Sequence, residues 1–389
     1  MSEQQRYRVL KRLASGGMAE VFVAESAGIE GFKKQVAIKR VLPQLSKKEQ
    51  FIAMFLDEAR LSAHLSHSNV VSVFDIGVGD GTYFIVMEFV DGADLKAVME
   101  HHRKIDRPVP VEIAVFIAAK ICQGLAYAHE LENLEGEPLK IVHRDITPAN
   151  VLITKYGEVK IVDFGLAKAS SQLAESDAGV IKGKFGYLAP ETVLELGVDH
   201  RVDIFALGII LWEMLAGKRL FLGDTDFATV KLVREANIPS ISRLNPDVSR
   251  ELEQIMGRAL ARDQGTRYHS ARDFGRDLTR FLFKLGRAVN EDDVAKTVRA
   301  AMGVPHHAVD GTQKIADLID LMLLEFKSLT KDGGDTAPGL SIFPAPTSDR
   351  AHASDATELG GLADALEGPD DPLPTEDSGV AGWFRGLVR

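Results

Sequence analysis

The chain has 389 residues, a formal net charge of −10 and a single cysteine, Cys122. This length allows roughly two or three domains around a large core, and the hydrophobic fraction of 45% is that of an ordinary soluble protein. The acidic balance argues against nucleic acid as the main partner, and a single cysteine excludes an internal disulfide. The sequence shows neither a secretory signal nor a transmembrane stretch, so we expect a cytoplasmic protein.

Three β-rich segments open the chain, at residues 7–14, 19–26 and 35–42. Small and flexible residues form the turn between the first two, where backbone N–H groups can approach phosphate oxygens without side-chain collision. These turn residues are Ala14, Ser15, Gly16, Gly17 and Met18, followed by Ala19. The turn alone fits a phosphate-binding loop and an ordinary hairpin equally well.

The third segment contains the run VAIK, which ends on Lys39, and a helix is predicted to follow at residues 47–65. Along that helix Glu58 shares a face with Phe55 and other apolar residues at spacings of three and four. A charge on a buried face requires a partner. We therefore predict that Glu58 has a cationic partner; the alternative is a solvated charge on the helix surface.

The next elements are a continuous apolar strand at residues 82–90, a helix that begins near Asp94, and a long helix at residues 111–130. The segment VDGADLKAVM favours Asp94 as the N-cap of its helix over a ligand contact. Further along, residues 201–216 are apolar nearly all round, which predicts a buried helix.

The stretch IVHRDITPANVLITKYGEVKIVDFG predicts a β-hairpin with strands at residues 150–154 and 158–164. A hairpin brings its two ends together, so Asn150 and Asp163 should lie near each other. An amide oxygen and a carboxylate form a hard-oxygen site that suits Mg²⁺ when substrate phosphates complete its shell. Asp145 is placed to accept a proton from an incoming hydroxyl.

The tripeptides HRD, ending at Asp145, and DFG, beginning at Asp163, stand 18 positions apart with Asn150 between them. In this combination they resemble the catalytic and metal-binding loops of the eukaryotic-type protein kinases, which include bacterial members. The resemblance implies an α+β, bilobal fold, with a small β-rich N-lobe at residues 7–90 and a larger, mainly helical C-lobe at residues 91–284.

The resemblance also implies a chemistry, in which the γ-phosphoryl group of ATP is transferred to protein serine or threonine hydroxyls. Asp145 would orient or deprotonate the hydroxyl, Asn150 and Asp163 would hold Mg²⁺, and Lys39, paired with Glu58, would position the phosphates. The remaining implied nucleotide contacts come from the glycine-rich loop, the adenine pocket and the hinge: Ala14, Ser15, Gly16, Gly17, Met18, Val21, Ala37, Met87, Glu88 and Val90.

Two further matches concern residues that do not touch substrate. Asp203 matches the aspartate that accepts hydrogen bonds from the catalytic-loop backbone, and Arg267 matches the arginine that pairs with Glu191 of the APE segment. Small-molecule kinases of similar fold resemble the family less well in this region. These matches therefore favour a protein kinase over a small-molecule kinase.

Three departures from the family pattern occur at residues 14 and 19, at Thr147 and at Lys184-Phe185. Alanines replace the outer glycines of the loop, and alanine disfavours positive φ, which points to lower loop mobility or lower nucleotide affinity. Thr147 replaces a common lysine, and Lys184-Phe185 stand where the family often has a threonine that bridges to that lysine. The altered glycine loop and Thr147 favour the alternative of a pseudokinase scaffold that binds nucleotide or partners without turnover. The loss of both residues of the lysine–threonine bridge indicates a coherent variant and weakens the choice between serine/threonine and tyrosine as acceptor.

The segment between DFG and APE resembles an activation loop and contains Ser170, Ser171 and Ser176. Arg144 can receive a phosphoserine through charge-assisted hydrogen bonds that would order the loop, as in autophosphorylation. The serines are equally consistent with a mobile loop in which they have no role. Sequence features of tyrosine kinases are absent after HRD, which favours serine or threonine as the acceptor.

Two segments follow the kinase-like region. Residues 285–330 are predicted to be helical, with Asn290 as a cap, either as extra helices on the large lobe or as a surface for self-association. Residues 331–389 hold 11 Asp and Glu against 4 Lys and Arg, with frequent Gly and Pro, which predicts a disordered tail. The last ten residues fit a docking peptide, a weak membrane-surface helix or a frayed end.

Overall fold

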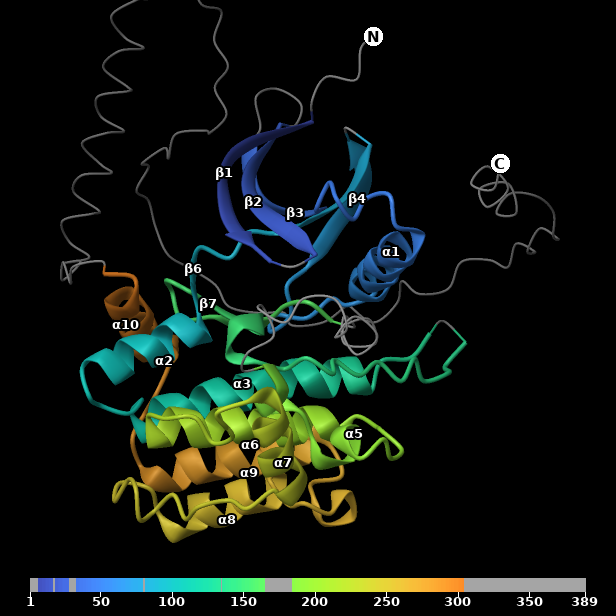
Figure 1. Cartoon of the computed structure of the whole chain (residues 1–389). Coiled ribbons are helices and arrows are strands. Elements are labelled where there is room, and N and C mark those ends of the chain that lie inside the picture. The colour runs from blue at the N-terminus through green and yellow to red at the C-terminus, as the bar shows by residue number, and fades with distance from the viewer. Residues whose placement is uncertain are drawn as a thin grey trace, which may run out of the picture. The chain divides into compact units, whose positions relative to one another are not determined.

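The computed structural model describes residues 6–16, 18–27, 33–79, 81–133, 135–164 and 184–303. These residues form a small β-rich lobe and a larger helical lobe (Figure 1), which confirms the predicted α+β, bilobal fold. Gly17, the three candidate phosphoserines, the second half of the helical extension and the acidic tail lie outside the described residues.

The small lobe is built on a five-stranded antiparallel sheet in the order β1-β2-β3-β5-β4. Its strands are β1 (Tyr7–Ser15), β2 (Ala19–Ala27), β3 (Lys33–Val41), β4 (Val73–Gly79) and β5 (Thr82–Glu88). β3 is the middle strand, and residues 36–39 in it are buried without interruption. A strand covered on both faces needs such a continuous apolar run, which the VAIK segment supplies up to its lysine.

One helix, α1 (Glu49–Ala63), covers a face of this sheet (Figure 1). Phe55 on this helix packs with Val41 and Ile85 of the sheet. The helix is two residues shorter at each end than predicted. The helical spacing of apolar residues continues beyond both ends, but there the backbone forms turns and not a helix. Glu58 lies buried on the same side, as its position in the sequence predicted.

The large lobe is formed by helices stacked below the sheet (Figure 1). They are α2 (Leu95–Lys104), α3 (Val111–His129), α5 (Pro190–Val193), α6 (Arg201–Ala216), α7 (Asp226–Glu235), α8 (Arg250–Ala259), α9 (Ala271–Leu285) and α10 (Glu291–Ala301). As predicted, α6 is a buried helix, with every residue from 202 to 215 inside the core. Within the described residues α3 alone is long and apolar enough to cross a membrane, and it is mostly buried in this lobe.

A second antiparallel sheet has three strands in the order β6-β7-β8. It lies between the five-stranded sheet and the helices of the large lobe (Figure 1). It consists of β6 (Gly92–Asp94), β7 (Val151–Thr154) and β8 (Val159–Ile161). The predicted hairpin is therefore confirmed, with Gly157 at its turn at a φ of 94°. The strands are shorter than predicted because Asn150 belongs to a 3-10 turn, η2 (Pro148–Asn150), and the ladder ends at Ile161.

The Asp94 side chain accepts a hydrogen bond from the Ala97 N–H at 2.7 Å, so the predicted N-cap is confirmed.

Candidate active site

The centre of the site is the side chain of Lys39, which extends from β3. Its Nζ lies 2.7 Å from Oε1 of Glu58 on α1, which confirms the predicted ion pair. The same Nζ lies 2.8 Å from Oδ1 of Asp163, a residue 124 positions further along the chain. One ammonium group thus joins the small lobe to the hairpin of the large lobe.

The charges around Lys39 explain how these groups ionise. Burial by itself lowers the pKa of the Lys39 ammonium, but Asp163 and Glu58 outweigh it and raise the pKa above its usual value. Burial raises the pKa of Glu58 to about 7, because Lys39 offsets only part of the effect and Asp163 adds a second negative charge. Burial also opposes ionisation of Asp163, yet the contact with Lys39 lowers its pKa.

Glu58 retains an unused acceptor. Its Oε2 atom is buried and has no hydrogen-bond partner in the part of the chain that the structure describes. One ammonium between two carboxylates also leaves a net negative charge when both are ionised. A buried polar atom without a partner is uncommon in a protein core and requires an explanation, such as a catalytic role or a bound ion.

The catalytic loop fixes Asp145 and Asn150 against each other. Nδ2 of Asn150 donates to the Asp145 backbone oxygen at 2.8 Å and to Asp145 Oδ2 at 3.2 Å. Because both amide hydrogens face Asp145, the amide oxygen is left as the ligand atom. The Val162 N–H donates to the Asn150 backbone oxygen at 3.0 Å, which places Asn150 beside the residue before Asp163, as the hairpin predicted.

Asp203 binds the backbone of the catalytic loop. Its two carboxylate oxygens accept the backbone N–H groups of His143 at 2.9 Å and Arg144 at 2.8 Å, and one of them also contacts His129 Nε2 at 2.8 Å. The predicted contact with the catalytic-loop backbone is confirmed. Arg144 and Asp163 both have positive φ, of 64° and 67°, which costs energy for residues other than glycine. Asp203 therefore helps to hold the loop in a conformation that it would not adopt alone.

His143 packs the catalytic loop against its neighbours. Its ring is fully buried, contacts the Val162 backbone oxygen at 3.0 Å and lies 4.5 Å from the Phe164 ring centroid. These contacts hold the segment on both sides of Asp163. A structural role accounts for all of them.

An apolar cluster adjoins these polar groups. It contains four of the expected adenine-pocket residues together with neighbours from both lobes: Val21, Ala37, Met87, Val90, Val71, Val73, Phe89, Leu152 and Val162. Sequence reasoning missed Leu152 and Val162. Because Val151 and Ile153 are in the large-lobe core, strand alternation indicates that Leu152 faces the opposite side. That alternation was the signal that could have identified it.

The glycine-rich loop is shorter than the sequence suggested. β1 continues to Ser15 and β2 begins at Ala19, so that Ala14 pairs with Val21 and Ala19 pairs with Val41 in the sheet. Neither alanine adopts positive φ, so the expected penalty for replacing glycine at these two positions does not arise. This is a correction to the prediction, and its reason is that both alanines pair within the sheet, although the register of β1 shifts between Arg12 and Ala14. The turn is closed by the Gly16 N–H, which donates to the Ala19 oxygen at 2.9 Å.

The hinge residue Glu88 is held by its side chain. Its carboxylate lies 2.9 Å from Lys160 Nζ and accepts the Ser72 N–H at 3.4 Å. The carboxylate is therefore engaged within the protein. Any nucleotide contact of Glu88 falls to its backbone, as the hinge prediction supposed.

Comparison with known proteins agrees with this geometry. A family model described as "Protein kinase domain" matches residues 7–274. The chain belongs to the protein kinase family. Members of this family use ATP as the phosphoryl donor.

Several bacterial kinases are similar to this one. "Tyrosine-protein kinase MasK" of Myxococcus xanthus is 41% identical over 276 residues, which cover 71% of this chain and 43% of that protein. "Serine/threonine-protein kinase PrkC" of Bacillus subtilis is 35% identical over 273 residues, covering 70% and 40%. The crystal structure of the Mycobacterium tuberculosis PknI kinase domain superposes with a TM-score of 0.52 at 27% identity, covering 71% of this chain and 96% of that one. The chain matches less than half the length of these two curated relatives.

A second buried ion pair confirms the family match in the large lobe. Arg267 binds Glu191 through two hydrogen bonds of 2.6 and 2.7 Å, and its Nε donates to the Ala261 oxygen at 2.7 Å. Both side chains are almost fully buried. This pair, predicted from the APE segment, ties that segment to the core.

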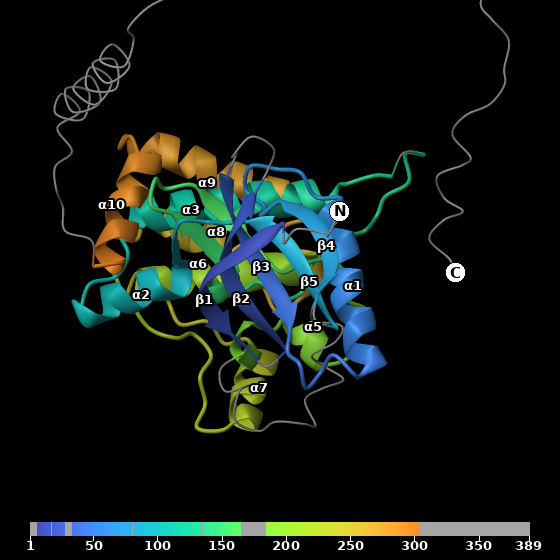
Figure 2. The same cartoon turned by 90° about the horizontal axis from the view of Figure 1, so that it is seen from above.

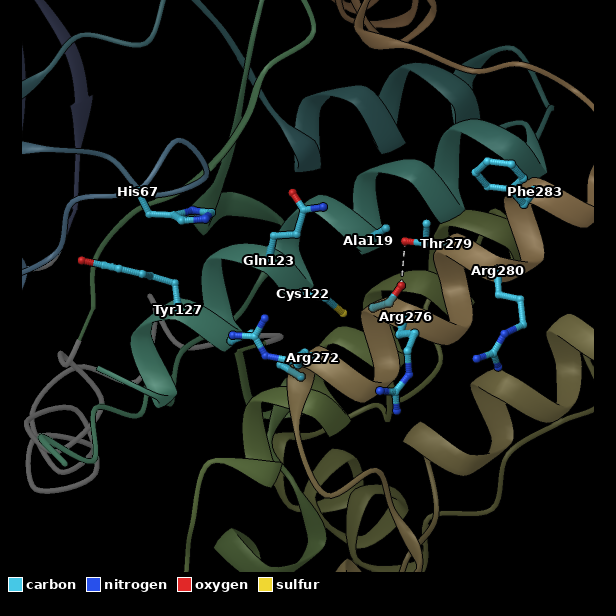
Figure 3. A pocket seen from close by; sticks show the side chains of 13 residues that line it. His67, Ala119, Cys122, Gln123, Tyr127, Arg272, Arg276, Thr279, Arg280 and Phe283 are labelled. Carbon is cyan, nitrogen blue, oxygen red and sulfur yellow. Dashed lines mark hydrogen bonds between the residues drawn. The ribbon is translucent and has the colours of Figure 1, made fainter. Parts of the chain in front are cut away.

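A groove of about 670 Å³ lies between α3 and α9 of this kinase (Figure 3). At one end the His67 ring stacks on Tyr127 with centroids 5.0 Å apart, and at the other end Phe283 is 88% exposed. Its lining shares no residue with the site around Lys39. The groove is therefore separate from the nucleotide site.

Proposed function

We propose that this chain is an ATP-dependent serine/threonine protein kinase of bacterial signalling, which transfers the γ-phosphoryl group to hydroxyls of protein substrates. The observation that carries the proposal is the simultaneous contact of Lys39 with Glu58 and Asp163. In protein kinases the Lys–Glu pair and the DFG aspartate must both be in place for activity. A chain that had lost turnover would be under no requirement to keep all three groups together.

The side chains present fit Mg²⁺. Asn150 offers an amide oxygen and Asp163 a carboxylate, which are the hard ligands that this ion takes together with substrate phosphates. The described ranges contain no cluster of three or more His, Cys, Asp or Glu suited to a metal, so phosphate oxygens would have to complete the shell. Bound there, Mg²⁺ would supply charge neutralisation at the β- and γ-phosphates.

The chain's own residues would do the rest by positioning and electrostatics. Asp145 accepts or orients the proton of the substrate hydroxyl, while Asn150 fixes the Asp145 carboxylate through its 3.2 Å hydrogen bond. Lys39 stays charged, since its pKa is raised, and so can neutralise phosphate charge. The apolar cluster around Ala37 and Met87 would exclude water from the adenine side.

The acceptor hydroxyl is the finer part of the proposal. PrkC is described as a serine/threonine kinase and MasK as a tyrosine kinase, and both match over most of the kinase domain. We favour serine or threonine because the sequence after HRD lacks tyrosine-kinase features. Arg144 supports a phosphorylated activation loop: its Nε is buried and has no partner among the described residues. Such a donor suits a phosphoserine.

The test is labelling of purified full-length protein with radioactive ATP and Mg²⁺, followed by identification of the phosphorylated residues by mass spectrometry. We expect phosphoserine or phosphothreonine in the wild type and none in Asp163→Ala. Phosphotyrosine alone would contradict the acceptor assignment. Nucleotide binding without any label would instead support the pseudokinase scaffold, which the Thr147 replacement favours.

A further inference from the structure

The helix α10 lies beyond residue 274, where the match to the family model ends, yet it is built into the large lobe. Val294, Ala295 and Val298 on its inner face are completely buried. Its N-terminus is closed by a capping box between Asn290 and Asp293, which confirms the predicted cap. The helix packs beside α2 (Figures 1 and 2) and also contacts β6, β7 and α3. It therefore touches the elements that carry the hinge and the catalytic hairpin.

The first turn of α10 supports the corner of the catalytic hairpin. A Cβ atom added at Gly157 would lie 1.8 Å from the backbone oxygen of Glu291, so the two backbones are in direct contact. The Glu291 side chain in turn pairs with Lys120 of α3 at 2.8 Å. This arrangement fixes the position of the turn that joins the strand after Asn150 to the strand before Asp163.

The last turn of α10 reaches the hinge through a relay of hydrogen bonds. Nη1 of Arg299 donates to the Lys155 backbone oxygen at 2.9 Å. The Lys155 N–H donates to the Asp91 backbone oxygen at 2.7 Å, and its Nζ pairs with the Asp91 carboxylate, also at 2.7 Å. Asp91 directly follows Val90 and leads into β6, which ends at Asp94. Arg299 thus acts on the hinge through Lys155.

We propose that α10 is a positioning element of the nucleotide site and that Arg299 is its positioning residue. Arg299 touches no ligand; it holds Lys155, which holds Asp91 and hence the segment that follows the adenine-binding hinge. The competing interpretation is that α10 only stabilises the large lobe. The two differ in what they predict for ATP affinity, because a purely structural helix would not change binding by the folded protein. The inference rests on nucleotide binding at the proposed site and requires no particular phosphate acceptor.

The test compares three variants of the full-length protein: Arg299→Ala, Arg299→Lys and Lys296→Ala. Lys296 lies on the same helix and pairs with Asp293 at its exposed surface, so it is the matched control. We expect Arg299→Ala to weaken ATP binding about 3- to 10-fold, the size of one lost charge-assisted hydrogen bond transmitted through a relay. The KM for ATP should rise by the same factor with kcat changed less than about twofold. Arg299→Lys should recover most of the affinity, and Lys296→Ala should match the wild type.

Hydrogen exchange gives a readout that does not depend on turnover. The Lys155 amide should exchange faster in Arg299→Ala than in the wild type or in Lys296→Ala, because its bond to Asp91 loses support. The proposal is overturned if Arg299→Ala keeps wild-type ATP affinity and wild-type protection of Lys155, whatever happens to its melting temperature. If the wild type itself binds no ATP, the proposed function fails, and the exchange rates still decide whether the relay exists.

Discussion

Two buried ion pairs, one in each lobe, differ in how completely their polar atoms are satisfied. In the large lobe, Arg267 meets both carboxylate oxygens of Glu191 and uses its Nε on a backbone oxygen. In the small lobe, Lys39 divides one ammonium between Glu58 and Asp163 and leaves Glu58 Oε2 without a partner within the described ranges.

The difference separates a structural pair from a functional one. A bidentate pair with its hydrogen bonds filled has no capacity for a ligand, and its role is to fix one segment against another. A pair with a spare acceptor, a shared cation and an excess of negative charge is incomplete until other charged groups arrive. The large-lobe pair should therefore control stability, and the small-lobe pair should control nucleotide chemistry. Four changes test this contrast.

The largest effect is expected from Arg267→Ala. It leaves the Glu191 carboxylate buried without a partner, which costs about 3–5 kcal/mol of the free energy of unfolding. Urea denaturation followed by circular dichroism measures the loss. The matched variant Arg267→Met/Glu191→Leu removes both charges and should recover most of the stability. If the single variant lost less than about 1 kcal/mol, the pair would not be the structural element we infer.

Lys39→Met should have the opposite profile. Loss of this ammonium is expected to lower kcat/KM for phosphotransfer by about 10²- to 10³-fold, the usual effect of removing one preorganised charged donor. Stability should fall by less than about 2 kcal/mol, because burial already raises the pKa of Glu58 and loss of Lys39 raises it further, so that Glu58 takes up a proton near neutral pH. Lys33→Met, on the same strand but exposed, is the control and should retain activity. A stability loss as large as that of Arg267→Ala would remove the contrast.

The pH dependence of stability provides the third test. Burial opposes ionisation of Asp203, but its bonds to His129 and the loop backbone outweigh this and lower its pKa. A carboxyl with a depressed pKa in the folded state stabilises above its unfolded pKa, and that stabilisation is lost as pH falls through the folded value. Asp203→Asn should cost about 1–3 kcal/mol at pH 7.

The difference between wild type and Asp203→Asn should then narrow as pH falls below about 4, where the unfolded carboxyl begins to take up protons. Thermal denaturation at a series of pH values measures it. A difference that stays constant down to acid pH would show that the Asp203 charge is not what holds the catalytic loop.

The smallest effect is expected from Ala14→Gly, which restores a glycine of the family pattern. Ala14 lies opposite Val21 in the sheet, next to a register shift in β1, and its φ is not positive, so no strained φ is relieved. We expect the ATP dissociation constant to change less than about 3-fold, since glycine in a strand alters stability by only about 0.5–1 kcal/mol. A gain of 10-fold or more, measured by calorimetry, would show that loop composition rather than the Lys39 cluster limits binding.

Much of this molecule follows from local sequence patterns. The apolar run through VAIK predicted a buried strand that carries Lys39, although β3 continues to Val41, and the spacing around Glu58 predicted a buried carboxylate on the following helix. The caps at Asp94 and Asn290 were likewise predictable, because capping depends on a few adjacent residues. Boundaries were less accurate, as at β7, where Asn150 joins a 3-10 turn.

Contacts between distant residues were less accessible. The sequence paired Lys39 with Glu58, but only the folded chain showed that Asp163 shares the same ammonium. Leu152 belongs to the apolar cluster on the adenine side because the hairpin packs beneath the sheet of the small lobe. Strand alternation indicates which side of the hairpin Leu152 faces, but not what it packs against. The position of α10 could not be predicted either, since the sequence allowed this helix to pack on the large lobe or to form a surface for self-association.

The sequence by itself placed most helices and strands to within a few residues, because periodicity and caps are properties of neighbouring residues. Its resemblance to protein kinases named the side chains that we propose carry the chemistry. The tertiary structure alone decided which charges share one partner, which acceptor stays unfilled and how Arg299 connects to the hinge. Those facts depend on the directions of side chains and on distances between residues far apart in the sequence. Both are set only when the hydrophobic cores of the lobes pack.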